Sequence, residues 1–176
     1  MTPKTVAFSE RLSAAMPKAK WNKYTHRNGY VQKKLGSGDV QHVEIAECVA
    51  RDYYFDLGYW SDNTFSGVHF EKCSFGSIIF DKVQFKDCVF ISCEFYECEF
   101  IAITLTGCEL HDTQIMGCGF TETNVIESHM QDCSINLSLI GRPTKFETTS
   151  IIRSRHIGTQ WVQKKENPKC PIIFKR

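Results

Sequence analysis

The sequence predicts an all-β protein whose chain winds into stacked coils of short extended segments. A large apolar residue returns at every fifth position over sixteen consecutive repeats, from Phe65 to Ile140, and a smaller residue stands two positions before each one. Residues two apart in an extended backbone point to the same side, so each repeat places two side chains inward. The remaining residues must turn the chain. Because this period of five fits neither a helix nor a plain strand, we expect a repeating coil.

The central residue of each repeat is the large apolar one, and we expect it to fill the inside of the coil. Burying such a side chain contributes roughly 1.5–3 kcal/mol. The predicted structural core consists of Phe65, Phe70, Phe75, Phe80, Phe85, Phe90, Phe95, Phe100, Leu105, Leu110, Ile115 and Phe120. The same phase continues to Ile140 and can be traced back to Ile45.

A repeat such as Phe85-Lys86-Asp87-Cys88-Val89-Phe90 resembles the pentapeptide-repeat family, whose usual consensus is A(D/N)Lxx. The resemblance covers about 95 residues, with Phe in place of the central Leu, Cys often in the small position and the Asp/Asn mostly absent. It implies a right-handed quadrilateral β-helix with four repeats per coil. Residues twenty apart then stack, and about five coils give a rod about 24 Å long at about 4.8 Å per coil.

Three segments follow from this pattern. Residues 1–39 are a basic N-terminal flank, with a short helix near residues 9–16 for which Ser9 is the expected N-cap. Residues 40–140 are the pentapeptide-repeat solenoid, and residues 40–60 are expected to be an irregular first coil that shields its open end. Residues 141–176 are a basic C-terminal flank, a partial coil or a cap, in which the period resumes one residue out of phase at Phe146 and Ile151.

Charge is segregated along the chain although the net charge is only +1. Residues 62–140 carry twelve acids and three lysines, whereas residues 1–61 have net charge +3 and residues 141–176 have +7. No Lys or Arg occurs between Lys86 and Arg142. The plain explanation for the acid excess is solubility, and the alternative is a binding surface for a basic partner.

Most cysteines fall on the inward small position, where a free thiol behaves as a small hydrophobe. Seven do so: Cys73, Cys88, Cys93, Cys98, Cys108, Cys118 and Cys133. We therefore expect inert core thiols rather than a disulfide framework, although pairs twenty apart would stack closely enough for a bridge.

We expect no enzyme activity, no cofactor and no metal. Gly36-Ser37-Gly38 lacks the lysine and hydroxyl of a phosphate-binding loop. Cys108 and His111 have ligand-like spacing, but the cysteine should face inward and the histidine outward. No apolar run is long enough to span a membrane, and we expect synthesis in the cytoplasm without a secretory signal peptide.

The function that this pattern favours is a rigid scaffold for protein–protein interaction, which the family resemblance extends to bacterial effectors secreted into host cells. The alternative is an acidic DNA mimic that binds a topoisomerase such as DNA gyrase, as some family members do. The partner would be a topoisomerase or a host protein with a basic surface, and a homodimer is compatible with the sequence. A third alternative is that the basic flanks bind nucleic acid or an anionic membrane. The candidate acidic binding face consists of Glu94, Glu97, Glu99, Glu109, Asp112 and Asp132.

Overall fold

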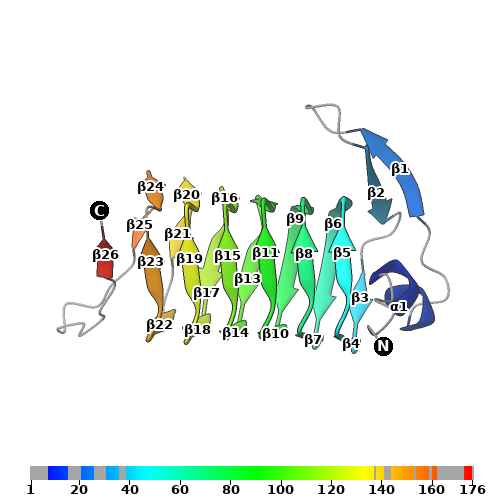
Figure 1. Cartoon of the computed structure of the whole chain (residues 1–176), viewed down its shortest axis with the longest axis horizontal. Coiled ribbons are helices and arrows are strands. Elements are labelled where there is room, and N and C mark those ends of the chain that lie inside the picture. Colours follow the sequence, from blue (N-terminus) through cyan, green and yellow to red (C-terminus); the bar gives the residue numbers. More distant parts are fainter. Residues whose placement is uncertain are drawn as a thin grey trace, which may run out of the picture.

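The structure is a computed structural model of the 176-residue chain, and it is a parallel β-solenoid whose coils stack along one axis (Figure 1). It describes residues 8–15, 21–25, 31–35, 39–136, 138–140, 144–152, 154–158, 160–161 and 173–175. The predicted all-β coil with four sides is confirmed, since strands pair with strands one coil away and in parallel.

Each coil has four faces. Face 1 is a six-stranded sheet and face 2 a seven-stranded sheet, whereas faces 3 and 4 are joined in one 13-stranded sheet that bends around a corner. Face 1 contains β4 (Glu44–Ala46), β7 (Thr64–Ser66), β10 (Gln84–Lys86), β14 (Thr104–Thr106), β18 (Asn124–Ile126) and β22 (Lys145–Glu147). Face 2 contains β5 (Val49–Arg51), β8 (His69–Glu71), β11 (Val89–Ile91), β15 (Glu109–His111), β19 (His129–Gln131), β23 (Ser150–Ile152) and β26 (Ile173–Lys175).

Two long strands, β6 (Tyr53–Ser61) and β9 (Ser74–Asp81), run through faces 3 and 4 and join them. Face 3 continues with β12 (Glu94–Tyr96), β16 (Gln114–Met116), β20 (Ser134–Asn136) and β24 (Arg155–Ile157). Face 4 continues with β13 (Glu99–Ile101), β17 (Gly119–Thr121), β21 (Leu139–Ile140) and β25 (Gln160–Trp161), and β3 (Val40–Gln41) begins it.

The central side chains form the core, as predicted. Phe85 pairs with Phe65 on one side and with Leu105 on the other, which is the expected offset of twenty residues. Aromatic rings one coil apart stack face to face: the Phe75 and Phe95 centroids are 4.7 Å apart with an interplanar angle of 7°. Leu105 is the exception among the predicted core residues, because it is only partly buried.

Each corner is made by the residue two positions after a central residue, whose φ lies in the left-handed region. Among the described residues, seventeen of these corner residues are not glycine, and their φ values lie between +48° and +59°. The corner backbone is tied to the next coil, as where the Glu47 amide donates to the Ser66 carbonyl at 3.0 Å. Such bonds offset the steric cost of the left-handed conformation.

The small inward residues form hydrogen bonds with the backbone in addition to packing in the core. Cys93 donates through Sγ to the Phe70 carbonyl at 3.3 Å, and Thr113 donates through Oγ1 to the Phe90 carbonyl at 3.4 Å. Ser128 acts differently, because its hydroxyl accepts from the Cys108 amide and donates to the Ile126 carbonyl. The eight cysteines that the structure describes are free and buried.

Helix α1 (Phe8–Ala15) closes the N-terminal end of the solenoid (Figure 1). Phe8 and Leu12 are completely buried, and the Phe8 ring lies 5.6 Å from that of Phe70. The prediction that Ser9 is the N-cap is wrong, since the helix already begins at Phe8 and the Ser9 amide donates to the Tyr53 hydroxyl at 3.3 Å. The first coil is thus covered by a helix.

A β-hairpin follows α1 and extends the 13-stranded sheet at the same end. Its strands are β1 (Trp21–Thr25) and β2 (Val31–Leu35), which pair antiparallel, and β2 lies parallel to β6. Lys34 fixes this attachment through an ion pair with Asp56 at 3.1 Å. The hairpin therefore covers part of the strand edge that the first coil would leave open.

The solenoid has about six coils rather than about five, because strands β22 to β25 add one beyond Ile140. Their register differs by one residue, so that Val125 pairs with Phe146 at an offset of twenty-one. Inside the later coils, where aliphatic residues replace phenylalanine, a cavity of about 40 Å³ remains. Its lining is entirely apolar and runs from Phe85 to Ile140.

Candidate protein-interaction surface

Large apolar side chains gather on one side of the outer surface. Of eight that are exposed among the described residues, seven lie on faces 3 and 4 or at the corner between them, and Ile91 on face 2 is the exception. We call six of them the apolar strip: Leu57, Tyr59, Ile79, Tyr96, Ile101 and Met116. Ile157, which is 65% exposed, lies farther along face 3.

The strands place the apolar strip in columns that follow the solenoid axis. Tyr96 of β12 pairs directly with Met116 of β16 on face 3. Tyr59 of β6 pairs directly with Ile79 of β9 on face 4, and Glu99 of β13 follows next in that column. The outward position of each side chain follows from the alternation along a strand, because its neighbours in sequence are the inward residues.

Polar groups at one end of the strip are satisfied internally. The Tyr59 hydroxyl donates to the Asp81 carboxylate at 2.6 Å, which raises the pKa of Tyr59. This contact holds the Tyr59 ring in place, so its apolar surface is presented in a defined orientation.

Two glycines leave room beside the strip in the fourth coil. A Cβ added at Gly119 would collide with the Glu99 carboxylate, and one added at Gly117 would touch the Glu97 side chain at 3.5 Å. Gly117 also has a φ of +65°, where glycine is favoured. The two glutamate side chains therefore lie over the backbone of the next coil, close to Met116.

The six residues of the predicted acidic binding face are divided among three sides of the solenoid. Glu94, Glu97 and Glu99 belong to one coil and lie around the corner between faces 3 and 4, beside the apolar strip. Asp112 and Asp132 stack one coil apart at the corner between faces 2 and 3. Glu109 lies on face 2, opposite face 4.

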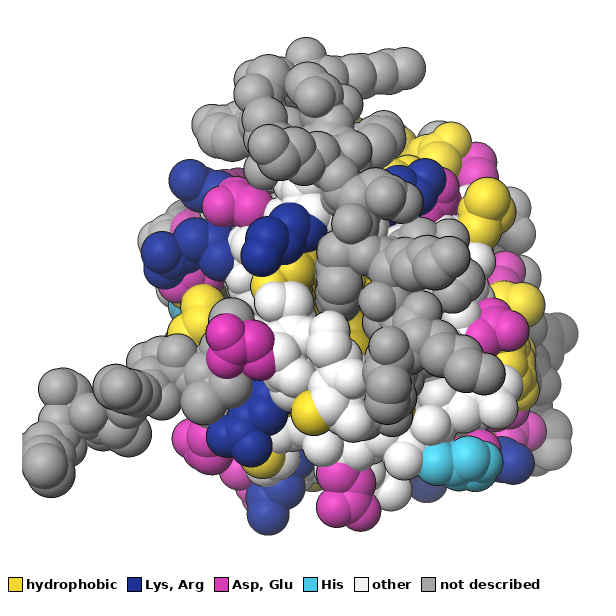
Figure 2. Space-filling view, turned by 90° about the vertical axis from the view of Figure 1, so that its right-hand side faces the viewer, with side chains coloured by type: hydrophobic (Ala, Val, Ile, Leu, Met, Phe, Trp, Pro, Cys, Tyr) yellow, Lys and Arg dark blue, Asp and Glu magenta, His cyan; other side chains and the backbone are white. Residues whose placement is uncertain are grey.

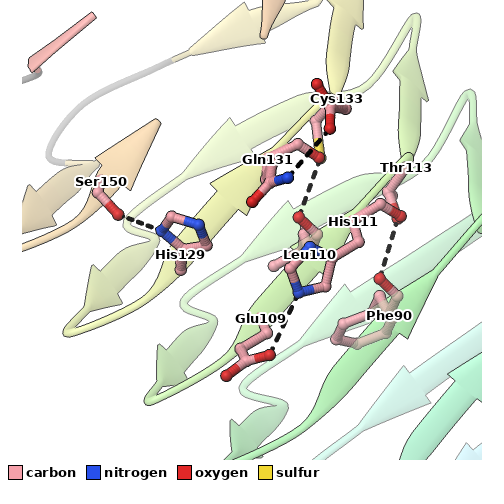
Figure 3. A network of polar contacts seen from close by, with 10 residues as sticks. Phe90, Glu109, Leu110, His111, Thr113, His129, Gln131, Cys133 and Ser150 are labelled. Carbon is pink, nitrogen blue, oxygen red and sulfur yellow. Dashed lines mark hydrogen bonds and ion pairs between the residues drawn. The ribbon is translucent and has the colours of Figure 1, made fainter. Parts of the chain in front are cut away.

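Face 2 differs from the strip in being polar and internally paired (Figure 3). The Glu109 carboxylate lies 3.2 Å from His111 Nε2, and the side chains of His129 and Ser150 contact each other. In earlier coils Arg51 donates to the Glu71 carboxylate at 2.6 Å, which lowers the pKa of Glu71. Arg51, Glu71 and Glu109 thus already have partners within the chain.

The described residues show no arrangement suited to metal chemistry, since no group of three or more His, Cys, Asp or Glu side chains could hold an ion. Cys108 and His111 are separated because the thiol is buried whereas the imidazole lies on the outer surface of face 2. No helix in this part of the chain is long and apolar enough to cross a membrane.

The charge pattern of the sequence does not reveal the apolar strip. The repeat pattern does indicate it, because any large apolar residue outside the two inward positions of a repeat must face outward. Tyr96 and Met116 each stand one position after a central residue, and Tyr59 and Ile79 one position before. Seen from the capped end, hydrophobic and acidic side chains alternate along one side of the rim (Figure 2).

Comparisons with known proteins give structural similarity only. No family model matches the chain. No curated protein matches it either. Among solved structures, it is similar to full-length QnrB1, described as a plasmid-mediated fluoroquinolone resistance protein, with 14% identity over 73% of this chain and 94% of that one and a TM-score of 0.42.

A second similar structure is HetL, a pentapeptide-repeat protein involved in heterocyst differentiation regulation in the cyanobacterium Nostoc. The identity is 7%, over 69% of this chain and 84% of that one, and the TM-score is 0.19. The five-residue period, the four-sided parallel coils and the left-handed corner residues together form the quadrilateral β-helix that the resemblance to pentapeptide-repeat proteins implies.

Proposed function

We propose that the protein is a non-catalytic scaffold that binds a protein partner through the apolar strip. The observation that carries this proposal is the gathering of exposed large apolar side chains on faces 3 and 4. Apolar side chains scattered singly on a surface need no explanation, but a contiguous group marks an interaction site. Tyrosine and methionine are also enriched at protein interfaces.

The stacked core supports this role because it holds the strip rigid. Tyr96 and Met116 each stand next to a buried core residue, Phe95 and Ile115 respectively. A surface that is already ordered loses little conformational entropy on binding, and this favours affinity. The interior cavity, in contrast, is small and lined only by apolar core residues, so it offers no polar group for catalysis.

Site-specific crosslinking tests the proposal. Met116 is replaced by a photo-crosslinking residue in one variant and Ile91 on face 2 in a matched control, and both are expressed in cells of the source organism. We expect a discrete covalent adduct with a partner protein from position 116 but not from position 91. The adduct should disappear when Tyr96→Ser and Ile79→Ser are added. Equal adducts from both positions, or none from position 116, would contradict the proposal.

A second candidate function is DNA mimicry directed at a topoisomerase such as DNA gyrase. It is favoured by the stacking of the exposed Asp112 and Asp132 in a region that contains no Lys or Arg. Such a field of one sign attracts a basic surface. A gyrase supercoiling assay with added quinolone should show restored supercoiling with the protein, and a clear loss of this effect with Asp112→Lys/Asp132→Lys. Inactivity of the unmodified protein would rule the candidate out.

Export from a bacterium into a host cell is compatible with the scaffold role, and the basic N-terminal flank is the feature that motivates it. A translocation reporter fused to the full chain would give a signal in the host cytosol that depends on a functional secretion system. Retention of the reporter in the bacterium would instead place the protein in the bacterial cytoplasm.

A further inference from the structure

The apolar strip is periodic along the solenoid axis, and this period restricts what can bind to it. Tyr96 and Met116 occupy equivalent positions in adjacent coils, as do Tyr59 and Ile79. Adjacent strands in a sheet lie about 4.8 Å apart, so the strip offers apolar contacts at that interval. A partner that lies along the axis should present its own anchors at nearly the same interval.

An α-helix meets this requirement better than a strand. A helix presents side chains on one stripe about every 5.4 Å, whereas a strand presents same-face side chains about every 6.7 Å. Over three steps a helix drifts from the coil spacing by about 2 Å and a strand by about 6 Å. Side chains can adjust to the mismatch of a helix, but the mismatch of a strand exceeds the spacing between two adjacent coils.

The acidic side chains beside the strip favour a partner whose surface is positively charged. Glu94, Glu97 and Glu99 surround the corner in the third coil, and Glu97 and Glu99 are exposed. Lys86 of the third coil lies on face 1, and the chain has no Lys or Arg between Lys86 and Arg142, so no lysine or arginine on faces 3 and 4 of the third to fifth coils opposes these glutamates. Lysine or arginine on the partner would therefore be attracted, and a second acidic surface repelled.

Building on the proposed function, we infer that the partner contributes a basic amphipathic α-helix that lies along the apolar strip, parallel to the solenoid axis. Its apolar residues recur at i, i+3 or i+4, and i+7, and contact Met116, Tyr96 and Ile79. Lysine or arginine on the flanks of that stripe pairs with Glu97 and Glu99. This is the helix-in-groove mode of peptide recognition transferred to the side of a solenoid.

Selection from two displayed libraries tests this inference with the full-length protein. One library randomises the exposed face of a stable helical scaffold, and the other displays linear peptides in which regularly placed prolines prevent helix formation. We expect enriched binders mainly from the helical library, with Lys or Arg flanking large apolar residues. Binding should weaken as salt concentration rises.

Variants locate the bound helix. Tyr96→Ala/Met116→Ala and Glu97→Lys/Glu99→Lys should each weaken binding at least about tenfold. The matched controls Ile91→Ala and Glu109→Lys on face 2 should leave affinity within about twofold. Circular dichroism and the melting temperature of each variant establish that it remains folded.

Two results would overturn the inference: binders that come chiefly from the proline-containing library, or helical binders that are acidic or insensitive to the strip variants. Binding of a second copy of the chain at the strip would also overturn the inference. It would be detected as oligomer formation that Tyr96→Ala/Met116→Ala abolishes. Failure of the proposed function is distinguishable from these outcomes, because it would appear as the absence of a crosslink from position 116.

Discussion

At the residue scale, the corner residues are the positions where this fold imposes an unfavourable backbone conformation. A left-handed conformation costs a residue with a side chain roughly 1–2 kcal/mol, yet seventeen corners in the described part of the chain are occupied by residues other than glycine. Asp and Glu are frequent there, but Leu57, Ala102 and Lys82 also occur. The repeat therefore imposes the conformation through backbone bonds between coils, and the local residue type has little influence.

Ala102→Gly should raise the free energy of unfolding by about 0.5 kcal/mol. Ala102 has a φ of +53°, so glycine removes steric strain that exceeds its greater loss of chain entropy. The matched control is Ala46→Gly, at an exposed strand position in β4. This substitution should lower the free energy of unfolding by about 0.5–1 kcal/mol. Urea denaturation measures both, and changes of the same sign would contradict this account.

At Thr113, the inward small residue supplies a hydrogen-bond donor as well as a small volume. Thr113 Oγ1 donates to the His111 carbonyl at 3.1 Å and to the Phe90 carbonyl at 3.4 Å. Thr113→Val should therefore destabilise the protein by about 1 kcal/mol, because shape is kept while the donor is lost. Thr113→Cys should cost less, since Cys93 and Cys133 occupy the same column. Equal stability of the Val variant and the parent protein would show that the donor is dispensable.

At the scale of the element, α1 replaces the coil that is missing at the N-terminal end. The Phe8 ring lies within 6.2 Å of the Tyr53, Phe55, Phe65 and Phe70 rings. A helix can close the end because its backbone hydrogen bonds are internal, so it offers no strand edge to another chain.

Phe8→Ala should lower the free energy of unfolding by about 3 kcal/mol or more, because it leaves a cavity against the first coil. Fluorescence of the buried Trp60, which lies in that coil, is a suitable local probe alongside circular dichroism. Leu57→Ala serves as the control, since Leu57 is 73% exposed and its loss should have little effect. A similar small effect of both substitutions would mean that α1 does not close the solenoid.

At the scale of the whole molecule, the core changes character along its axis. Stacked phenylalanines fill the second and third coils, and aliphatic side chains leave the apolar cavity in the later ones. Packing defects of this kind lower stability in proportion to their volume. Because each coil contacts mainly its neighbours, the later coils should be the weaker part of the rod.

Leu110→Phe should stabilise the protein by about 1 kcal/mol, because the new ring would fill the cavity and continue the stack of Phe70 and Phe90. The reverse substitution, Phe90→Leu, should destabilise it by a similar or larger amount. Thermal unfolding measures both. A lower melting temperature for Leu110→Phe would indicate overpacking and contradict the role assigned to the cavity.

Buried thiols should make the protein sensitive to alkaline pH. Burial raises the pKa of Cys133 from 9.0 to about 11, so its contribution to stability is complete below pH 9 and is lost as the pH rises through about 11. One such thiol lowers the free energy of unfolding by about 1.4 kcal/mol per pH unit in that interval. Cys133→Thr should reduce the slope measured between pH 9 and 11. An unchanged slope would show that this thiol does not contribute.

The sequence predicted most of the core correctly, because the inward positions are defined by a local rule that every repeat obeys. The rule placed Phe95 and Cys93 inside, and the strands confirm both. It failed at the N-terminal end, where Ser9 was expected to cap a helix that begins at Phe8. Helix α1 is fixed by Phe8 packing on the first coil, a contact that no local pattern could reveal.

Periodicity also could not determine which outward residues lie together. Glu97 and Glu109 appear as members of one acidic group in the sequence, but the coil places them on different sides of the rod. Tyr96 and Met116, twenty residues apart, become neighbours. The sequence by itself therefore determined the coil and its inner residues, since each repeat dictates its own alternation. Only the tertiary structure decided the outer surface, because contacts between outward residues depend on how successive coils are aligned.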